Sequence, residues 1–318
     1  MSRLFEALSN EQAKRDGPGI VPFIVATAES AQEVEREQRS HNFVPPAIAS
    51  ANEASLPVAA LNAVPHTPTQ KEYGVLTKSV EILEDRSVPL KVSVESRLVA
   101  LTEPNSLGAE KFRALVTRLD FLRKQRELKS VQITSSVINE GKSLVAGNLA
   151  MTLAKYSAAK TLLIEGDLHR PTLAELLGLS QLDGVAQWWS CNDQELTRFV
   201  HKLNDMPLWF LSAGKACDRP SDILRSTRFA KAFAQLASQF EWVVVDSTPM
   251  LPIIDVNLWS RLVDGTLLVV REGVAPMKAL KKGLQALDHP KLIGVVMNEA
   301  SGSDQANYEN QYYGTGKS

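Results

Sequence analysis

The segment VQITSSVINEGKS, residues 131–143, decides the fold. A short β-branched run at 131–134 leads into a loop that ends in Gly141-Lys142-Ser143, and a helical pattern follows over 142–156. A strand, a loop and a helix joined at Gly-Lys-Ser form a phosphate cradle, because backbone N–H groups and the positive end of the helix face the loop. The segment therefore predicts a nucleotide site, with Lys142 on the outer phosphates and the Ser143 hydroxyl on Mg²⁺.

The loop departs from the standard P-loop (Walker A) pattern at one position, because Ser136 stands where a glycine is usual. Asn139 occupies a position that we expect to need a left-handed backbone, which asparagine tolerates better than most residues. Gly-Lys-Ser also occurs by chance in sequences, but its place between a strand and a helix favours a phosphate loop here. The residues expected to contact the nucleotide are Asn139, Glu140, Gly141, Lys142, Ser143 and Leu144.

Short apolar runs alternate with helical stretches after residue 105. Strands buried on both faces are continuous apolar runs, and their alternation with helices is typical of a parallel sheet covered on both sides. The sequence therefore predicts an α/β protein with a doubly wound, mostly parallel sheet of the P-loop NTPase type. The expected strands are 131–134, 161–164, 208–211, 242–245, 266–270 and 292–297, and the expected helices are 142–156, 222–239 and 276–287.

Carboxylates follow two of these strands, at the edge where ligands of such sheets bind. Glu165 and Asp167 end one strand, and both are expected to point to the same side, to hold Mg²⁺ or to take a proton from an incoming hydroxyl. Asp246 ends another strand, as the second metal-holding element of P-loop proteins does. Each could also be a solvated turn acid, but their order along the sheet favours one site with Ser143, Asp167 and Asp246 as the metal-holding residues.

Composition narrows the class of protein further. The chain has 35 basic and 36 acidic residues, so charge gives no argument for a nucleic-acid partner. Two cysteines and five single histidines provide neither a disulfide framework nor a zinc site, and a cytoplasmic location is expected. Neither an apolar run of ~20 residues nor a secretory pattern is found in the sequence.

The chain divides into three expected parts. Residues 1–104 are interpreted as a flexible N-terminal extension, because 15–70 is rich in proline and poor in packing groups. A short helix at 1–14 could dock on a partner through Leu4, Phe5 and Leu8, with a frayed terminus or a small folded domain as alternatives. Residues 105–300 form the P-loop domain, and 301–318 form a flexible tail with three of the five tyrosines.

These motifs resemble those of the bacterial tyrosine kinases of capsular and exopolysaccharide production, P-loop proteins related to the Min and Par ATPases. The resemblance rests on 134–150, on the Glu165-x-Asp167-x-x-Arg170-Pro171 block and on Asp246-Ser247-x-Pro249. It extends over about 105–300 and includes the segment 110–115, which is similar to the helix that packs protomers into a ring. Val137 stands early in the loop, where Min and Par proteins have a signature lysine, and this favours the kinase branch.

The resemblance implies an ATP- and Mg²⁺-dependent protein-tyrosine autokinase that regulates exopolysaccharide synthesis or export. Lys142, Asp167, Glu165 and Asp246 would be its catalytic residues and Asn298 would contact adenine. Tyr308, Tyr312 and Tyr313 would be phosphorylated by neighbouring copies. A membrane-embedded polysaccharide co-polymerase would activate the kinase and hold it at the inner face of the membrane.

Several residues differ from the family pattern. Ile138 and Asn139 replace Pro-Gly, Thr248 replaces a proline, Glu165 replaces an aspartate, and Val116 replaces an arginine of the ring-forming helix. A homo-oligomer therefore stays an open expectation. Two other functions also stay open: a nucleotide-switched scaffold or localisation ATPase, and a nucleotide-binding pseudokinase.

Overall fold

A nine-stranded sheet organises the computed structural model, in the order β1-β9-β8-β3-β7-β4-β6-β5-β2. The structure describes residues 23–26, 86–93, 96–179, 182–191, 193–204, 206–215, 219–251, 255–271, 273–274, 276–287 and 291–298. The strands are β1 (Phe23–Ala26), β2 (Ser87–Val88), β3 (Ser130–Ser135), β4 (Thr161–Glu165), β5 (Val200–Leu203), β6 (Leu208–Leu211), β7 (Trp242–Asp246), β8 (Gly265–Arg271) and β9 (Leu292–Asn298). Seven strands from β1 to β6 in that order are parallel, and β5 pairs antiparallel with β6. The predicted mostly parallel sheet is confirmed.

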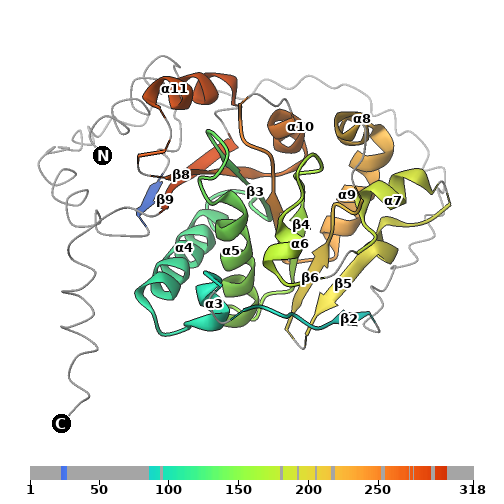
Figure 1. Cartoon of the computed structure of the whole chain (residues 1–318), viewed down its shortest axis with the longest axis horizontal. Helices are drawn as coiled ribbons and strands as arrows, with labels where there is room; N and C mark the ends of the chain where they lie inside the picture. Colours follow the sequence, from blue (N-terminus) through green and yellow to red (C-terminus); the bar gives the residue numbers. More distant parts are fainter. Residues whose placement is uncertain are drawn as a thin grey trace, which may run out of the picture. The chain divides into compact units, whose positions relative to one another are not determined.

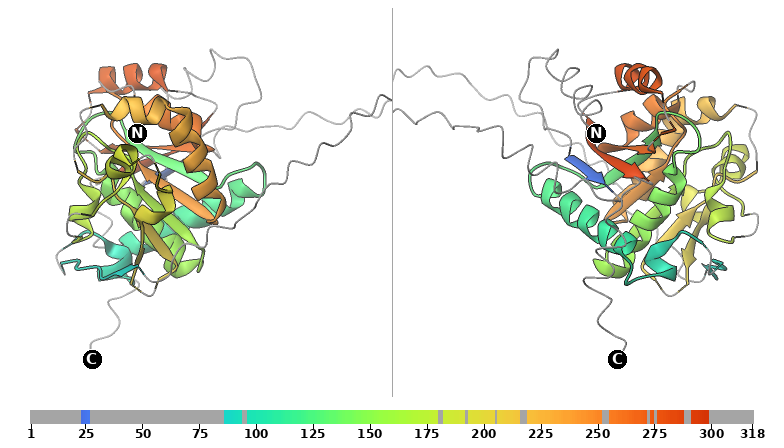
Figure 2. Two further views of the ribbon diagram at one scale, coloured as in Figure 1. Left: turned by 90° about the vertical axis from the view of Figure 1, so that its right-hand side faces the viewer. Right: turned by 60° about the vertical axis from the view of Figure 1, so that its left-hand side comes forward.

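Helices cover both faces of this sheet (Figures 1 and 2). They are α3 (Val99–Thr102), α4 (Leu107–Arg123), α5 (Lys142–Tyr156), α6 (Leu173–Leu176), α7 (Val185–Ser190), the 3₁₀ turn η1 (Leu196–Phe199), α8 (Pro220–Arg225), α9 (Thr227–Ser238), α10 (Asp255–Leu262) and α11 (Met277–Ala286). In β7, Val244 packs in the core with α4 and α5, whereas Val243 and Val245 pack in the core with α8, α9 and α10. Successive side chains of one strand therefore enter opposite layers, as a doubly wound sheet requires.

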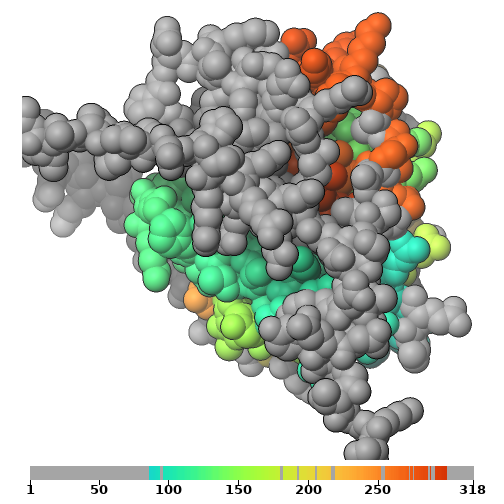
Figure 3. Space-filling model, turned by 90° about the vertical axis from the view of Figure 1, so that its left-hand side faces the viewer, coloured from blue at the N-terminus to red at the C-terminus, as the bar shows by residue number. Residues whose placement is uncertain are grey.

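Helix α4 begins at a side-chain cap and borders the surface. The Ser106 hydroxyl accepts a hydrogen bond from Ala109 N, which satisfies one of the free N–H groups of the first turn. Phe112, Leu115 and Leu119 face the core, while Phe121 is half exposed. Figure 3 shows the teal-to-green part of the chain, which includes α4, at the surface of this face. Val116, which stands where the family resemblance implies an arginine, is buried in the core.

Two segments of the expected N-terminal extension belong to the folded unit, which is a correction to the boundary at residue 105. Phe23–Ala26 pairs with β9 as the edge strand β1, and Leu98, just before α3, is fully buried against the core that contains α5. The Asn148 side chain accepts a hydrogen bond from Ala100 N and donates one to Arg97 O. The proline-rich composition holds only for 15–70, so it gives no reason to treat the segment with the apolar Leu98 and Ala100 as flexible. The helix expected at 1–14 and the tail at 301–318 lie outside the described residues.

The helix expected over 222–239 and strand β5 also differ from the sequence prediction. The helix expected over 222–239 is two helices, because the backbone of Ser226 is extended and its hydroxyl caps α9 through Phe229 N. Strand β5 was not expected, since it has two lysine or histidine side chains among its four residues. Across the described part of the chain, none of the helices has the length and apolar character that crossing a membrane requires.

Candidate functional site

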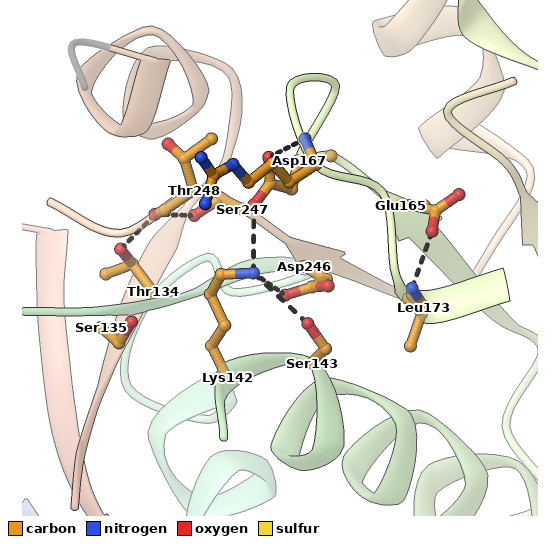
Figure 4. Close-up of polar contacts among 12 residues, drawn as sticks. Thr134, Ser135, Lys142, Ser143, Glu165, Asp167, Leu173, Asp246, Ser247 and Thr248 are labelled. Carbon is orange, nitrogen blue, oxygen red and sulfur yellow. Dashed lines mark hydrogen bonds and ion pairs between the residues drawn. The ribbon is translucent and has the colours of Figure 1, made fainter. Parts of the chain in front are cut away.

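The loop between β3 and α5 lies at the carboxyl edge of the sheet, where β3 is flanked by β7 and β8 and β4 follows β7. Because these strands are parallel, their ends meet at one edge and bring residues from distant parts of the chain together. Lys142 and Ser143 come from the first turn of α5, Asp246 from the end of β7 and Asp167 from the segment after β4. Figure 4 shows these four side chains converging.

The Lys142 ammonium is the centre of this group. Its Nζ lies 3.2 Å from Asp167 Oδ2, 3.6 Å from Asp246 Oδ1 and 3.3 Å from the Ser143 hydroxyl oxygen. Burial favours the neutral amine, but the charges of Asp246 and Asp167 outweigh it and raise the pKa of Lys142. The lysine is therefore held as a cation at the mouth of the loop.

Asp246 is fully buried, and neither of its carboxylate oxygens accepts a hydrogen bond within the described segments, although the Lys142 ammonium lies 3.6 Å from Oδ1. Burial raises the pKa of Asp246 to about 6, although the Lys142 charge and the Ser143 hydroxyl oppose this rise. Buried carboxylate oxygens normally have donors or a cation, so these oxygens fit Mg²⁺ or a water that Mg²⁺ holds. Ser143 and Asp167 lie close enough to Lys142 to belong to the same group.

The loop has the backbone geometry that the sequence predicts. Asn139 has φ 64° and Gly141 has φ 89°, both in the left-handed region. A Cβ at Gly141 would come 2.1 Å from Asn298 Nδ2, so the position requires glycine on steric grounds as well. The left-handed turn at Asn139 confirms the reason given for asparagine there.

Asn298, at the end of β9, lies against this loop. Its Nδ2 donates a 2.9 Å hydrogen bond to Glu140 O. The structure thus places Asn298 beside the loop, and contact with adenine stays a prediction. Leu144 is half buried in the first turn of α5, where its side chain packs on the core and its carbonyl accepts from Asn148 Nδ2.

Glu165 does not join the group, which corrects the expectation that it points to the same side as Asp167. Its Oε1 accepts hydrogen bonds from Leu173 N and Ala174 N, at 2.7 and 3.0 Å. Its Oε2 accepts from the Ser212 hydroxyl and from Ala213 N, both at 3.1 Å. Figure 4 shows Glu165 turned toward Leu173 and away from Lys142. The extra methylene and the free N–H groups at the start of α6 account for this direction.

Sequence reasoning missed two contacts that support the loop. The Thr134 hydroxyl donates a 2.8 Å hydrogen bond to Thr248 O, which ties the end of β3 to the segment after β7. Arg271, the last residue of β8, donates from its backbone N to Glu140 Oε1 at 3.2 Å. Arg271 could have been found from the sequence, because it ends a strand as Asp246 does, and polar residues at the ends of parallel strands meet at one edge. Tyr308, Tyr312 and Tyr313 lie outside the described residues.

These residues fit a nucleotide and a divalent cation. The loop has its helix N-terminus, a lysine cation and a hydroxyl on one side, and two carboxylates on the other. A triphosphate would meet N–H groups and the ammonium, while the carboxylates and the Ser143 hydroxyl provide the oxygen ligands that Mg²⁺ prefers. The arrangement can bind, polarise and orient a phosphoryl group.

Comparison with known proteins finds relatives over most of the chain. The tyrosine-protein kinase YwqD of Bacillus subtilis is 30% identical over 224 residues, which cover 70% of this chain and 93% of YwqD. The putative tyrosine-protein kinase CapB of Staphylococcus aureus is 29% identical over 226 residues, covering 70% and 98%. The succinoglycan biosynthesis transport protein ExoP of Rhizobium meliloti is 28% identical over 218 residues, but this covers only 27% of ExoP. No protein-family model matches the chain.

A solved structure agrees with these sequence relatives. The kinase domain of the Escherichia coli tyrosine kinase ETK superposes with a TM-score of 0.59 at 26% identity. The match covers 65% of this chain and 82% of that domain. Sequence and structure therefore lead to the same group of proteins.

Proposed function

Because the chain belongs to the bacterial tyrosine kinases of the P-loop type, we propose that it transfers the γ-phosphoryl group of ATP to tyrosine. The observation that supports this most is the convergence of Lys142, Ser143, Asp167 and Asp246 at one sheet edge. YwqD and CapB are named as tyrosine-protein kinases, and ExoP is named as a succinoglycan biosynthesis transport protein. The regulation of exopolysaccharide synthesis or export is part of the same proposal.

In this function Lys142 stabilises the charge that spreads over the β- and γ-phosphates, as a fixed cation at the loop. Asp246 and the Ser143 hydroxyl would hold Mg²⁺, which would neutralise phosphate charge when bound. Asp167 accepts the proton of the attacking tyrosine hydroxyl, because its carboxylate lies 3.2 Å from Lys142 Nζ and is slightly less buried than that of Asp246. Positioning and electrostatic stabilisation provide most of the acceleration in such reactions.

The proposed acceptors are Tyr308, Tyr312 and Tyr313 on neighbouring copies of the chain. The chain continues beyond β9, whose last residue, Asn298, lies against the phosphate loop. A tail that begins at this edge starts near the proposed active site, and its residues 299–318 could extend over at most roughly 70 Å. An activating membrane partner of the polysaccharide export machinery would bring copies together and place the chain at the inner face of the membrane.

Nucleotide binding is tested with Lys142→Met. Removal of the ammonium leaves the phosphates without their cation, so affinity for Mg-ATP in a calorimetric titration is expected to fall by roughly a hundredfold. Lys155→Met is the matched control, because Lys155 lies at the other end of α5 and its ammonium bonds to Ala100 O. Equal affinity of Lys142→Met and the wild type would contradict the placement of the site.

Tyrosine transfer is tested by mass spectrometry of the purified protein after incubation with ATP and Mg²⁺. We expect phosphate on the tail tyrosines and its loss in the triple Phe variant of Tyr308, Tyr312 and Tyr313. Tyr156→Phe is the control, because Tyr156 is 61% exposed on the folded domain. Hydrolysis of ATP without any phosphotyrosine would contradict the kinase proposal.

One observation favours a second candidate, a nucleotide-binding module without transfer. Glu165 is fully engaged in four hydrogen bonds, so only Asp167 remains of the two acids in its block. Binding of ATP with neither hydrolysis nor phosphotyrosine would select this pseudokinase. Hydrolysis with no phosphotyrosine would instead select the nucleotide-switched ATPase.

A further inference from the structure

We propose that Glu140 is a positioning residue that holds the phosphate loop in its binding conformation. Its hydrogen bonds would stabilise a backbone conformation that the standard loop reaches through glycine. This proposal rests on the proposed nucleotide binding. Sequence reasoning placed Glu140 among the residues that contact the nucleotide, and for its backbone this stays a prediction. The structure turns its carboxylate into the loop, where it is fully buried.

The Glu140 carboxylate accepts three hydrogen bonds from the loop and its neighbour strand. Oε2 accepts from the Ser136 hydroxyl at 2.7 Å and from Val137 N at 2.8 Å. Oε1 accepts from Arg271 N, at the end of β8, at 3.2 Å. One side chain thus closes the loop on itself and ties it to the sheet.

The bend that this carboxylate closes has an unfavourable backbone conformation. Asn139 precedes Glu140 with φ 64°, a region that non-glycine residues rarely adopt. Such a conformation persists only where surrounding contacts determine it. The contacts here are those of the Glu140 side chain, together with Asn298 Nδ2 on Glu140 O and the Arg271 guanidinium on Asn139 O.

Ser136, the serine that departs from the standard loop pattern, belongs to the same group of hydrogen bonds around Glu140. Ser136 stands at the position of a standard glycine, and its side chain is fully buried. Its hydroxyl has Glu140 Oε2 as its acceptor. A glycine there would give the loop freedom, whereas Ser136 paired with Glu140 removes it. The two residues should therefore be energetically coupled.

The test is a double-mutant cycle of Glu140→Gln and Ser136→Ala in the full chain, with Mg-ADP affinity measured by calorimetry and the melting temperature of nucleotide-free protein measured alongside. Glutamine presents an NH₂ group to at least one of the three donors, so Mg-ADP affinity is expected to fall by roughly tenfold or more. In the Ser136→Ala background the same change should cost clearly less, because one donor is already gone. Glu127→Gln is the control, since Glu127 is exposed before β3, at the opposite edge of the sheet.

The outcomes separate this proposal from the one on which it rests. Wild-type protein that binds neither Mg-ADP nor Mg-ATP would overturn the proposed nucleotide function, and this inference with it. Wild-type binding with unchanged affinity in Glu140→Gln would overturn only the positioning role. A lowered melting temperature would also overturn the positioning role if the affinity, measured well below the melting transition, is unchanged. Glu140 would then stabilise the fold and have no effect on the binding conformation of the loop. Additive effects in the cycle would contradict the coupling.

Discussion

The Lys142 ammonium lies 3.2 Å from Asp167 Oδ2, so the proposed phosphate-binding cation is paired with the proposed proton acceptor. The second oxygen of Asp167 accepts a hydrogen bond from Arg170 N at 3.0 Å. A phosphate that engages Lys142 competes with this carboxylate for the ammonium. We therefore expect nucleotide binding to release Asp167 for the tyrosine hydroxyl, and thus to couple binding with the appearance of the base.

Asp246 provides a prediction about pH. Its pKa is about 6 in the folded protein and near 3.8 in an unfolded chain, so the folded state binds the proton more tightly. The protonated group stabilises the fold below pH 4, and this advantage is lost as pH rises through 6. At pH 8 it amounts to roughly 3 kcal/mol of lost stability.

Asp246→Asn removes this titration. The free energy of unfolding of the variant, relative to wild type, should therefore increase between pH 5 and pH 8, while Mg²⁺-dependent activity is lost. Denaturant unfolding at several pH values measures the difference, with the exposed Asp222→Asn as control. A difference between Asp246→Asn and wild type that does not change with pH would contradict the assigned burial of a charged group.

Glu165 distinguishes a structural acid from a catalytic one. Its carboxylate accepts four hydrogen bonds, and glutamine can supply only one acceptor oxygen. Glu165→Gln should therefore lower the free energy of unfolding by about 2 kcal/mol or more. Glu175→Gln, an exposed change in α6, the helix whose first N–H groups donate to Glu165, should have little effect. A large loss of transfer rate at unchanged stability would instead return Glu165 to the catalytic group.

Leu98 tests the corrected start of the domain. Its side chain is fully buried, and one of its methyl carbons would come 3.0 Å from a Cβ at Gly147 of α5. Leu98→Ala should lower the free energy of unfolding by roughly 2–5 kcal/mol, whereas Leu101→Ala, at a half-buried site of α3, should cost less. A chain that begins at Glu103 should melt below one that begins at Arg86. Equal melting temperatures would show that 86–102 adds nothing to the fold.

The strands and the main site could be predicted because their signals are local. Continuous apolar runs such as Trp242–Asp246 and the Gly141-Lys142-Ser143 ending need only neighbouring residues to be recognised. The meeting of Lys142 with Asp167 and Asp246 then follows from parallel strands ending at one edge.

Other features depended on partners that are distant in the sequence. Nothing near Glu165 indicates that Ser212 and Ala213 donate to its carboxylate, so its direction could not be inferred. The place of Glu140 in the motif likewise gives no sign that its carboxylate accepts from Arg271 N, 131 residues away. Side-chain direction at a site is thus decided by tertiary hydrogen bonds, which spacing alone does not contain.

The most direct test of transfer between copies mixes two variants, neither of which is expected to label its own tail. One chain has an intact site and Phe at positions 308, 312 and 313, and the other has Lys142→Met with its tail tyrosines intact. After incubation with γ-labelled ATP and Mg²⁺, in the presence and absence of membrane-partner segments, label is measured on each chain. The account predicts label on Tyr308, Tyr312 and Tyr313 of the Lys142→Met chain only in the mixture. An unlabelled Lys142→Met chain, under conditions in which the wild type labels its own tail, would contradict transfer between neighbouring copies.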